Sequence, residues 1–391
     1  MPPLELTHYV TRYRNRTGVE RILSRHHGTD ADYNINSQVV PLFLRKSNDD
    51  RIVPARLSWR NSILTARRRV RKTPSRKPTK VAAYHDLWGI TFMADLDQAD
   101  RRIGVLHTDF PDCAAAFKNV HGLLDGVLCV SNPLLKKAAQ AWPDLQKENR
   151  IAALPYPVDL PKGFERPPRD GSRPFTIGYN GPIQLEEHRV DRVPEILERL
   201  AAQAQSFRME FIGDGYDAPE MERQLALKHE AAFHGRLSGQ PYWKVLSGWD
   251  AVIFTNETPG LPLTLLDAIS LGVIPIYPRL GDGGEDYVRR VDERLAYPDG
   301  DIVAATEQLM RVSRMSGADL VKLRKQCTDL VQPHLENNYF RVFSEFATRI
   351  HNLERVSRAK FGKKPKGLAD WCPLGILNKL RPMAIWKTKL G

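Results

Sequence analysis

Several features that define other classes of protein are missing from this sequence of 391 residues. The four cysteines lie far apart and form no C-x-x-C pair, which excludes a disulfide scaffold and a cysteine-built zinc site. No window approaches the ~18–20 uninterrupted apolar residues of a membrane-spanning helix. The N-terminus lacks the basic flank, the apolar run and the cleavage site of a secretory signal. We therefore expect a protein of the reducing cytoplasm.

The fingerprints of several nucleotide-binding and catalytic sites are missing as well. No G-x-G-x-x-G follows the first expected strand, and G-x-x-x-x-G-K-[ST] does not occur, so nothing supports a dinucleotide-binding or P-loop protein. G-x-S-x-G and H-E-x-x-H are also absent, which removes the usual signals of a serine hydrolase and of a zinc protease. The chemistry must therefore lie in other loops.

The residues that are present predict a folded protein of two domains. Hydrophobic residues make up 42% of the chain and charged residues 27%, which excludes a wholly disordered protein. The length suggests two domains of roughly 150–200 residues each. Residues 161–174 contain four prolines and two glycines and are the expected linker. The expected parts are an N-terminal domain (1–160), a C-terminal domain (175–330), a closing helix (331–355) and a basic tail (356–391).

Short apolar runs that end in polar residues recur along the chain, with helical patterns between most of them. This alternation is typical of the βα units of a parallel sheet. The expected strands lie at 4–10, 38–44, 80–86, 101–109, 125–132, 175–181, 208–215, 231–237, 250–256 and 273–278. The predicted fold class is therefore α/β, with two doubly wound domains facing each other across a cleft. In this architecture, ligands bind outside the carboxyl ends of the strands, where the polar residues fall.

The positive charge of the chain is concentrated in two segments. The net charge is +12, and residues 67–80 contribute +8 and residues 355–391 contribute +9, so the rest carries 12 − 17 = −5. Such segments are most often solvated faces or loops. As functional elements they would contact phosphate, on an anionic membrane or on a nucleic acid. Trp371, Trp386 and aliphatic residues are interleaved with lysines, which favours a membrane, and the absence of a reading motif disfavours nucleic acid.

The stretch 250–278, DAVIFTNETPGLPLTLLDAISLGVIPIYP, contains the most informative loop of the sequence. An apolar strand ends at Thr255, and a helix with a proline in its first turn is expected to follow. Gly260 would let a ligand approach the backbone, and the N–H groups at the start of the helix can hold a phosphate. The alternative is an ordinary strand-to-helix turn with a solvated Asp267.

This stretch resembles the donor-site motif of glycosyltransferase family 4 and its relatives with the GT-B fold, E-G-[FL]-P-x-x-L-L-E-A-x-A-x-G. The residues GLPLTLLDAISLG, from Gly260 to Gly272, match the motif almost throughout. Other family motifs are similar, in the same order, to LHTDFPD, DGVLCVSN, IAALPYPVDL, FTIGYNGPIQLEEHRVDRV, FIGDG and AAFHGRL. Residues 355–391 and 45–80 fall outside the resemblance. It implies two Rossmann-like domains and a C-terminal helix that crosses back.

The resemblance assigns roles to residues of the donor loop. Asp267 stands at the second glutamate of the motif, which binds the ribose of a nucleotide-sugar. The backbone of Gly260 and Leu261 would meet the distal phosphate. The first glutamate of the motif, which contacts the sugar, falls on Pro259. We therefore expect Glu257, two residues earlier, to replace it as a catalytic residue.

The cationic clamp that the family uses on the diphosphate is altered in this sequence. Pro182 replaces the arginine that follows Gly181, and the lysine position falls on His188. Negative charge that develops on the departing diphosphate must still be stabilised. The candidate cations are His188, Arg189, Arg192, Arg12, Arg14 and Arg16. The alternative for Arg189 and Arg192 is that they lie on a helix surface without such a role.

Further donor contacts are implied for four positions. Gly18 resembles the glycine of a family loop that passes close to the donor phosphates, and Gly181 precedes the altered clamp. Arg236 and Leu237 are expected beside the base.

The N-terminal domain is expected to hold the acceptor and one catalytic histidine. His107 follows a buried strand, and the resemblance implies that it contacts the transferred sugar or orients the acceptor. Without the resemblance, a histidine at this place is more often a local hydrogen-bonding residue. His85, Asp86 and Asp109 are expected on the acceptor side.

The expected function is the transfer of a sugar from a nucleotide-sugar to a hydroxyl of a glycan or a lipid-linked acceptor. The resemblance implies a retaining reaction without a metal or another cofactor, in cell-surface polysaccharide or glycolipid synthesis. The basic segments 67–80 and 355–391 would hold the enzyme on the inner face of the membrane. The alternatives are a non-catalytic GT-B relative that acts as a binding or partner subunit, and a nucleic-acid-binding protein.

Overall fold

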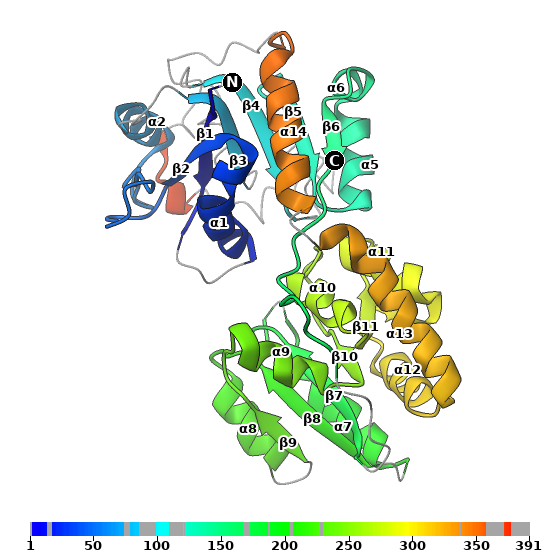
Figure 1. Cartoon of the computed structure of the whole chain (residues 1–391). Helices are drawn as coiled ribbons and strands as arrows, with labels where there is room; N and C mark the ends of the chain where they lie inside the picture. The colour runs from blue at the N-terminus through cyan, green and yellow to red at the C-terminus, as the bar shows by residue number, and fades with distance from the viewer. Residues whose placement is uncertain are drawn as a thin grey trace, which may run out of the picture. The chain divides into compact units, whose positions relative to one another are not determined.

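A computed structural model describes most of the chain, namely residues 2–13, 18–73, 79–85, 99–108, 120, 122–166, 173–186, 188–203, 206–226, 230–335, 338–356 and 371–376. The chain divides into two compact units, whose elements are labelled in Figure 1. The first unit comprises Met1–Leu154 and Asn337–Gly391, and the second comprises Pro155–Glu336.

The first unit is built on a six-stranded, fully parallel sheet with the strand order β2-β1-β3-β4-β5-β6. Its strands are β1 (Leu4–Val10), β2 (Ile35–Pro41), β3 (Thr79–His85), β4 (Ala99–Leu106), β5 (Gly126–Cys129) and β6 (Ile151–Ala153). The last five residues of β3 are all buried, so the strand is covered on both faces, as a parallel sheet requires.

Helices flank this sheet, and the last long one comes from the far end of the chain. The helices are α1 (Gly18–Thr29), the 3-10 turn η1 (Asp30–Tyr33), α2 (Ile63–Lys72), α5 (Asn132–Ala141), α6 (Pro143–Lys147) and α14 (Asn338–Asn352). Ser62 and Ser131 cap α2 and α5 through their hydroxyl groups. Helix α14 packs against η1, β3 and β4 with Phe343 and Ile350 fully buried. The predicted return of the C-terminal helix is therefore confirmed.

The second unit contains another six-stranded parallel sheet, in the order β12-β11-β10-β7-β8-β9. The strands are β7 (Phe175–Asn180), β8 (Phe207–Ile212), β9 (Ala231–Phe233), β10 (Ala251–Ile253), β11 (Ile274–Arg279) and β12 (Ala296–Pro298). The helices are α7 (Arg192–Ala201), α8 (Ala218–Ala226), α9 (Gly239–Ser247), α10 (Leu263–Ser270), α11 (Gly283–Val291), η2 (Glu293–Leu295), α12 (Ile302–Ser313), α13 (Gly317–Val331) and η3 (Gln332–His334). The two sheets confirm the predicted α/β class with two Rossmann-like units.

The strand order of the second unit fixes where a ligand is expected. From β7 the chain runs outward to β8 and β9, and it then returns to β10 on the other side of β7. This reversal is the topological switch point of a doubly wound sheet, and ligands bind outside the carboxyl ends of the strands there. The loops that follow β7 and β10 are therefore the places to examine.

The boundary between the units lies earlier than the linker expected at 161–174. It falls between Leu154 and Pro155, and Val158 already bonds to the carbonyl of His334 at 3.1 Å. Arg166 donates to the carbonyls of Trp249 and Gly272, which anchors it in the second unit. The prolines and glycines suggested a linker over the whole segment, but these long-range bonds to the backbone decide that its first half belongs to the second unit.

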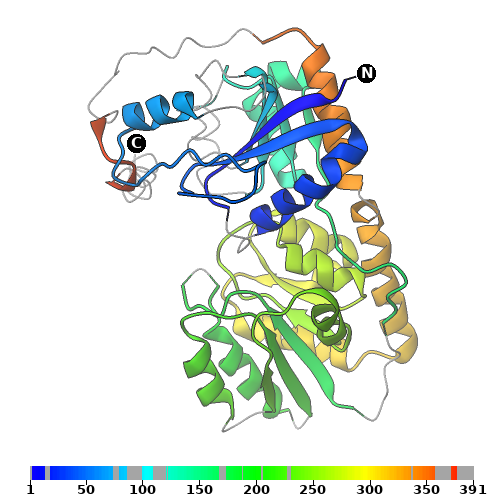
Figure 2. The ribbon, with the colours of Figure 1, turned by 60° about the vertical axis from the view of Figure 1, so that its left-hand side comes forward.

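A short segment near the C-terminus returns to the first unit beside α2, as Figure 2 shows in red. Pro373 forms an isolated antiparallel bridge with Ser62, and the Leu374 amide donates to the carbonyl of Asn61 at 2.8 Å. Leu374 is buried. Among the residues that the structure describes, none of the helices combines the length and the apolarity needed to cross a membrane.

Candidate functional site

Two glycine-containing loops pack against each other at the carboxyl ends of β7 and β8. The Gly181 amide donates to the carbonyl of Ile212, and the Ile183 amide donates to that of Asp214. Gly213 has a φ of 144°, and a Cβ there would lie 1.9 Å from the carbonyl oxygen of Gly181. Glycine is therefore required at 213, because neither the conformation nor the space admits a side chain. This contact fixes the position of Gly181, where the loop after β7 that leads to Arg189 begins.

The Glu257 cluster, made of Glu257, Arg189, Arg192, Asp191 and Asp299, joins the loop after β7 to the loop after β10. Glu257 accepts hydrogen bonds from both arginines through its Oε1 atom. Asp191 also holds Arg189, at 3.0 and 3.1 Å, and Asp299 holds Arg192 at 3.3 Å. The predicted sugar-contacting carboxylate and two predicted phosphate ligands are thus paired with one another.

The two arginines of the Glu257 cluster differ in how firmly the fold holds them. The side chain of Arg192 is 8% exposed and donates to the Thr255 carbonyl at 3.1 Å, which ties α7 to the end of β10. The side chain of Arg189 is 35% exposed. Exposed ion pairs contribute little free energy, so Arg189 can exchange its partners for a phosphate. His188 contributes its backbone, since its carbonyl accepts the hydroxyl of Thr255 at 2.8 Å.

Asp267 is fully buried in α10, and it is linked to the end of β7 through a tyrosine. The Tyr242 hydroxyl donates to Oδ2 of Asp267 at 2.8 Å and accepts from the Asn180 amide group at 2.8 Å. The alternative of a solvated aspartate at this position is therefore wrong. A nucleotide that reached this carboxylate would meet it already oriented by Tyr242.

The amide of Gly260, which was expected to meet a phosphate, donates instead to a buried carboxylate. Its partner is Oδ2 of Asp282, at 2.7 Å, which also accepts from the hydroxyl of Tyr277 at 3.0 Å. Asp282 caps α11 by accepting from the Glu285 amide at 2.8 Å. Burial raises the pKa of Asp282 to about 6, although these hydrogen bonds favour its ionised form. The loop between β10 and α10 is thereby fixed to the start of α11.

The other residues that were expected at the donor site are distributed over both units. Arg236, which follows β9, forms an exposed ion pair with Asp214 at 2.8 Å, and Leu237 is partly exposed. Gly18 is the first residue of α1 in the first unit. Of the other arginines considered, Arg12 lies over the ring of Trp59, 5.7 Å from its centroid. Arg14, Arg16, Asp86 and Asp109 lie outside the described residues.

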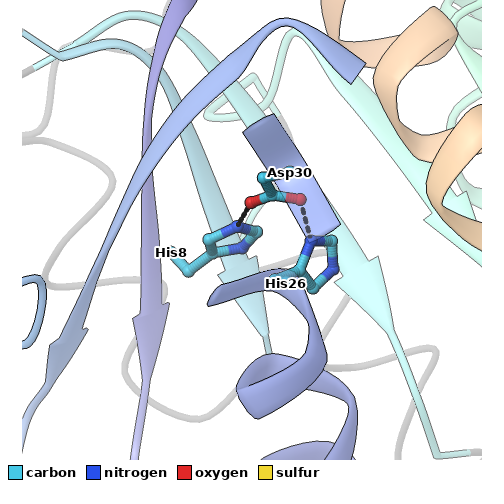
Figure 3. A group of neighbouring side chains, drawn as sticks. All are labelled: His8, His26 and Asp30. Carbon is cyan, nitrogen blue, oxygen red and sulfur yellow. Dashed lines mark hydrogen bonds and ion pairs between the residues drawn. The ribbon is translucent and has the colours of Figure 1, made fainter. Parts of the chain in front are cut away.

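In the first unit, His107 and His85 are in contact, and three further residues extend the group. Nδ1 of His85 lies 2.8 Å from Nε2 of His107, and both rings are buried. Figure 3 shows how His8 and His26 both turn toward the carboxylate of Asp30. Two imidazoles and a carboxylate whose ligand atoms lie within 4.8 Å of one another are also the donor set of many metal sites. The structure thus joins two predicted residues to three that the sequence analysis missed.

The residues that were missed gave weak signals in the sequence. Tyr242 and Asp282 stand outside the motif that carries the resemblance, and their partners are 25 and 22 residues away. His8 is a histidine inside an apolar strand, which is the one local hint that a buried polar group was present. His26 and Asp30 are separated by a helical turn, but nothing local relates them to His8.

Two Rossmann-like units of this kind make up the fold of the GT-B glycosyltransferases. Residues 174–314, which include the whole donor loop, match the family model described as glycosyl transferases group 1. The matched residues lie within the second unit and make up less than half of the chain, and they confirm the resemblance to GT-B glycosyltransferases that the sequence shows.

Individual relatives agree with this assignment. A lipopolysaccharide 1,6-galactosyltransferase of Salmonella typhimurium (strain LT2) is 26% identical over 146 residues, which cover 36% of this chain and 39% of the relative. The match thus spans less than half the length of that curated relative. The apo structure of the lipopolysaccharide outer core galactosyltransferase WaaB has a TM-score of 0.69 at 17% identity, covering 88% of this chain and 99% of that one. Anabaena HepE, in complex with UDP and glucose, has a TM-score of 0.66 at 11% identity, covering 90% and 100%. At these identities the structures show the shared fold.

Proposed function

We propose that the protein transfers a sugar from a nucleotide-sugar to a hydroxyl of a glycan or lipid-linked acceptor in cell-surface glycan synthesis. The observation that carries this proposal is the Glu257 cluster at the switch point of the second unit, inside the segment that matches the glycosyltransferase family. It brings two guanidinium groups and a carboxylate to the edge where a doubly wound sheet binds its ligand. The galactosyltransferase relative and the relative that holds UDP and glucose support the substrate class and make UDP-sugars the first donors to test.

In the proposed reaction, the second unit holds the donor. Asp267 binds the ribose, and Arg189 leaves Glu257 to neutralise the diphosphate as its bond to the sugar breaks. Arg192 remains bonded to the Thr255 carbonyl and keeps the loop in place. Glu257, released by Arg189, becomes the carboxylate that contacts the sugar. The departing phosphate accepts the proton of the attacking hydroxyl on the same face, which gives retention, and no metal or other cofactor takes part.

A thermal-shift measurement tests this proposal with the full chain and UDP-, GDP-, ADP-, CMP- and TDP-linked sugars. We expect one class of donor, the UDP-sugars, to raise the melting temperature, since a ligand at about 100 times its Kd adds about 2.7 kcal/mol to stability. Asp267→Asn keeps the acceptor for Tyr242 but removes the charge, so the shift should shrink when it is measured against the variant's own melting temperature. Asp329→Ala, at an exposed ion pair on α13, should leave the shift unchanged.

The second candidate function is a non-catalytic GT-B subunit. It is favoured by Pro182 in place of the family arginine and by the pairing of both remaining arginines with Glu257. It is also favoured by the Gly260 amide, which already bonds to Asp282. If no nucleotide-sugar shifts the melting temperature and none is turned over, this second function replaces the first.

We further propose that the first unit binds the inner membrane surface through α2 and the C-terminal segment beside it. Arg68, Arg71 and Lys72 are exposed on α2, and Trp371 is 63% exposed in the neighbouring segment. Exposed cations and an exposed indole on one unit suit the headgroup region of an anionic bilayer. The antiparallel bridge between Ser62 and Pro373 places the described part of the C-terminal segment beside the start of α2, which supports a shared surface.

Flotation with vesicles tests this surface. We expect the full chain to float with phosphatidylglycerol-containing vesicles and not with pure phosphatidylcholine. A variant with Arg68, Arg71 and Lys72 changed to glutamine should bind about a hundredfold more weakly, at about 1 kcal/mol for each cation. The matched control changes the exposed cations Arg199, Arg223 and Lys325 of the second unit. Equal loss in both variants, or stronger binding to DNA than to vesicles at physiological salt, would contradict the assignment.

A further inference from the structure

A continuous chain of hydrogen-bonded side chains runs through the core of the first unit to His107. It consists of Tyr339, His26, Asp30, His8, His85 and His107, in this order. The successive distances are 3.1, 2.7, 3.4, 2.9 and 2.8 Å. Every member is at least 97% buried, so water does not compete for these bonds.

The register of the sheet explains why three histidines from distant parts of the sequence form a row. His8 pairs with Ala83 across β1 and β3, and His85 lies two residues further along β3. His85 pairs in turn with Val105 of β4, and His107 lies two residues further on. Residues two apart in a strand face the same side of the sheet, so the three rings lie in one row on one face.

The charge of Asp30 determines which atom donates and which accepts in each of these hydrogen bonds. Burial alone would raise the pKa of Asp30, but His26 and His8 hold it below its ordinary value, so the carboxylate only accepts hydrogen bonds. Burial lowers the pKa of His8 to about 4 and that of His107 to about 3, and it also lowers the pKa of His85. These three imidazoles are therefore neutral at pH 7, and each has one N–H and one lone pair.

We propose that Asp30, acting through His8 and His85, fixes His107 in the tautomer with its proton on Nε2. His8 must donate its Nε2 proton to Asp30, so its Nδ1 accepts from Nε2 of His85. Nδ1 of His85 then lacks a proton and accepts from Nε2 of His107. The remaining ring nitrogen of His107, Nδ1, is therefore a hydrogen-bond acceptor.

This tautomer determines which chemical group suits Nδ1 of His107. An unprotonated imidazole nitrogen accepts from a hydroxyl or an amine and repels a phosphate or carboxylate oxygen. Any group that meets Nδ1 must therefore be a hydrogen-bond donor, as a sugar hydroxyl is, and this consequence rests on the proposed function. Asp30, His8 and His85 do not meet the ligand in this scheme, so they are positioning residues.

A metal ion on His8, His26 and Asp30 predicts the opposite tautomer. If Nε2 of His8 bound a metal, its proton would lie on Nδ1 and would be donated to Nε2 of His85. His85 would then carry its proton on Nδ1, and His107 would do the same. The protonated nitrogen of His107 therefore distinguishes the two arrangements.

Nitrogen NMR of the full chain labelled with ¹⁵N-histidine measures this tautomer directly. The His107 signals are assigned by their loss in His107→Gln. We expect the unprotonated shift at Nδ1 and the protonated shift at Nε2 in the wild-type protein. A proton on Nδ1 instead, or stoichiometric metal in the purified protein, would overturn the proposal.

Two variants test the route from Asp30 to His107. Asp30→Asn allows either the oxygen or the NH2 group of the side-chain amide to face His8. His85→Phe removes the acceptor of His107. Each variant should therefore give His107 signals of the other tautomer. Tyr339→Phe changes the other end of the hydrogen-bonded series. It leaves the Asp30 carboxylate in place and should leave the His107 shifts unchanged. Unaltered His107 shifts in both Asp30→Asn and His85→Phe would refute the route. If the wild-type spectrum is as expected but no donor is turned over, the proposed function fails while the tautomer assignment stands.

Discussion

Changing Glu257 to glutamine is expected to shift binding and turnover in opposite directions. The variant should bind UDP about fivefold more tightly, because a unit charge about 4 Å from the diphosphate, in solvent, changes the energy by about 1 kcal/mol. Its turnover should fall about ten- to a hundredfold, because a hydrogen bond to a charged group contributes about 1.5–3 kcal/mol. Glu257 pairs with Arg189 and Arg192 in the structure. In the proposed function it also contacts the sugar when the donor is bound, which is the reason for both effects.

Calorimetric titration with UDP and a turnover assay with the donor identified by thermal shift measure the two effects. Glu195→Gln is the matched control, since Glu195 forms an exposed ion pair with Arg199 on α7 and lies outside the Glu257 cluster. The control should change neither quantity. Weaker UDP binding in Glu257→Gln would mean that Glu257 holds Arg189 and Arg192 in position for the diphosphate and does not compete with the diphosphate for them.

Changing Gly213 to alanine is expected to destabilise the second unit by about 2–5 kcal/mol. The added Cβ would lie 1.9 Å from the carbonyl oxygen of Gly181, and this is a backbone atom that a rotamer change cannot move. The φ of 144° adds strain for any residue with a side chain. Since Gly181 begins the loop that leads to Arg189, donor binding should weaken together with stability.

The unfolding midpoint of the full chain, followed by tryptophan fluorescence, measures this effect. Gly317→Ala is the control, because Gly317 begins α13, has open space around its Cα and should gain about 0.4–1 kcal/mol from reduced chain entropy. A Gly213→Ala midpoint equal to that of the wild type would contradict this prediction. It would show that the loops after β7 and β8 can move apart without loss of stability.

The sequence by itself determined the fold class and the place of the loop that carries the glycosyltransferase motif. Buried parallel strands need apolar runs, and these runs are visible one at a time, as in β7 and β10. The turn from Thr255 to the helix that contains Asp267 is likewise a local feature, so the motif from Gly260 to Gly272 was readable without any tertiary contact.

Only the tertiary structure decided which polar groups are partners. Glu257 meets Arg189 from 68 residues away, and His26 meets Tyr339 from 313 residues away. The boundary at Pro155 depends likewise on bonds from Arg166 to distant carbonyls. The physical reason is that burial follows from a residue's own apolarity, whereas a hydrogen bond or an ion pair requires two side chains whose distance is set by strand order and register.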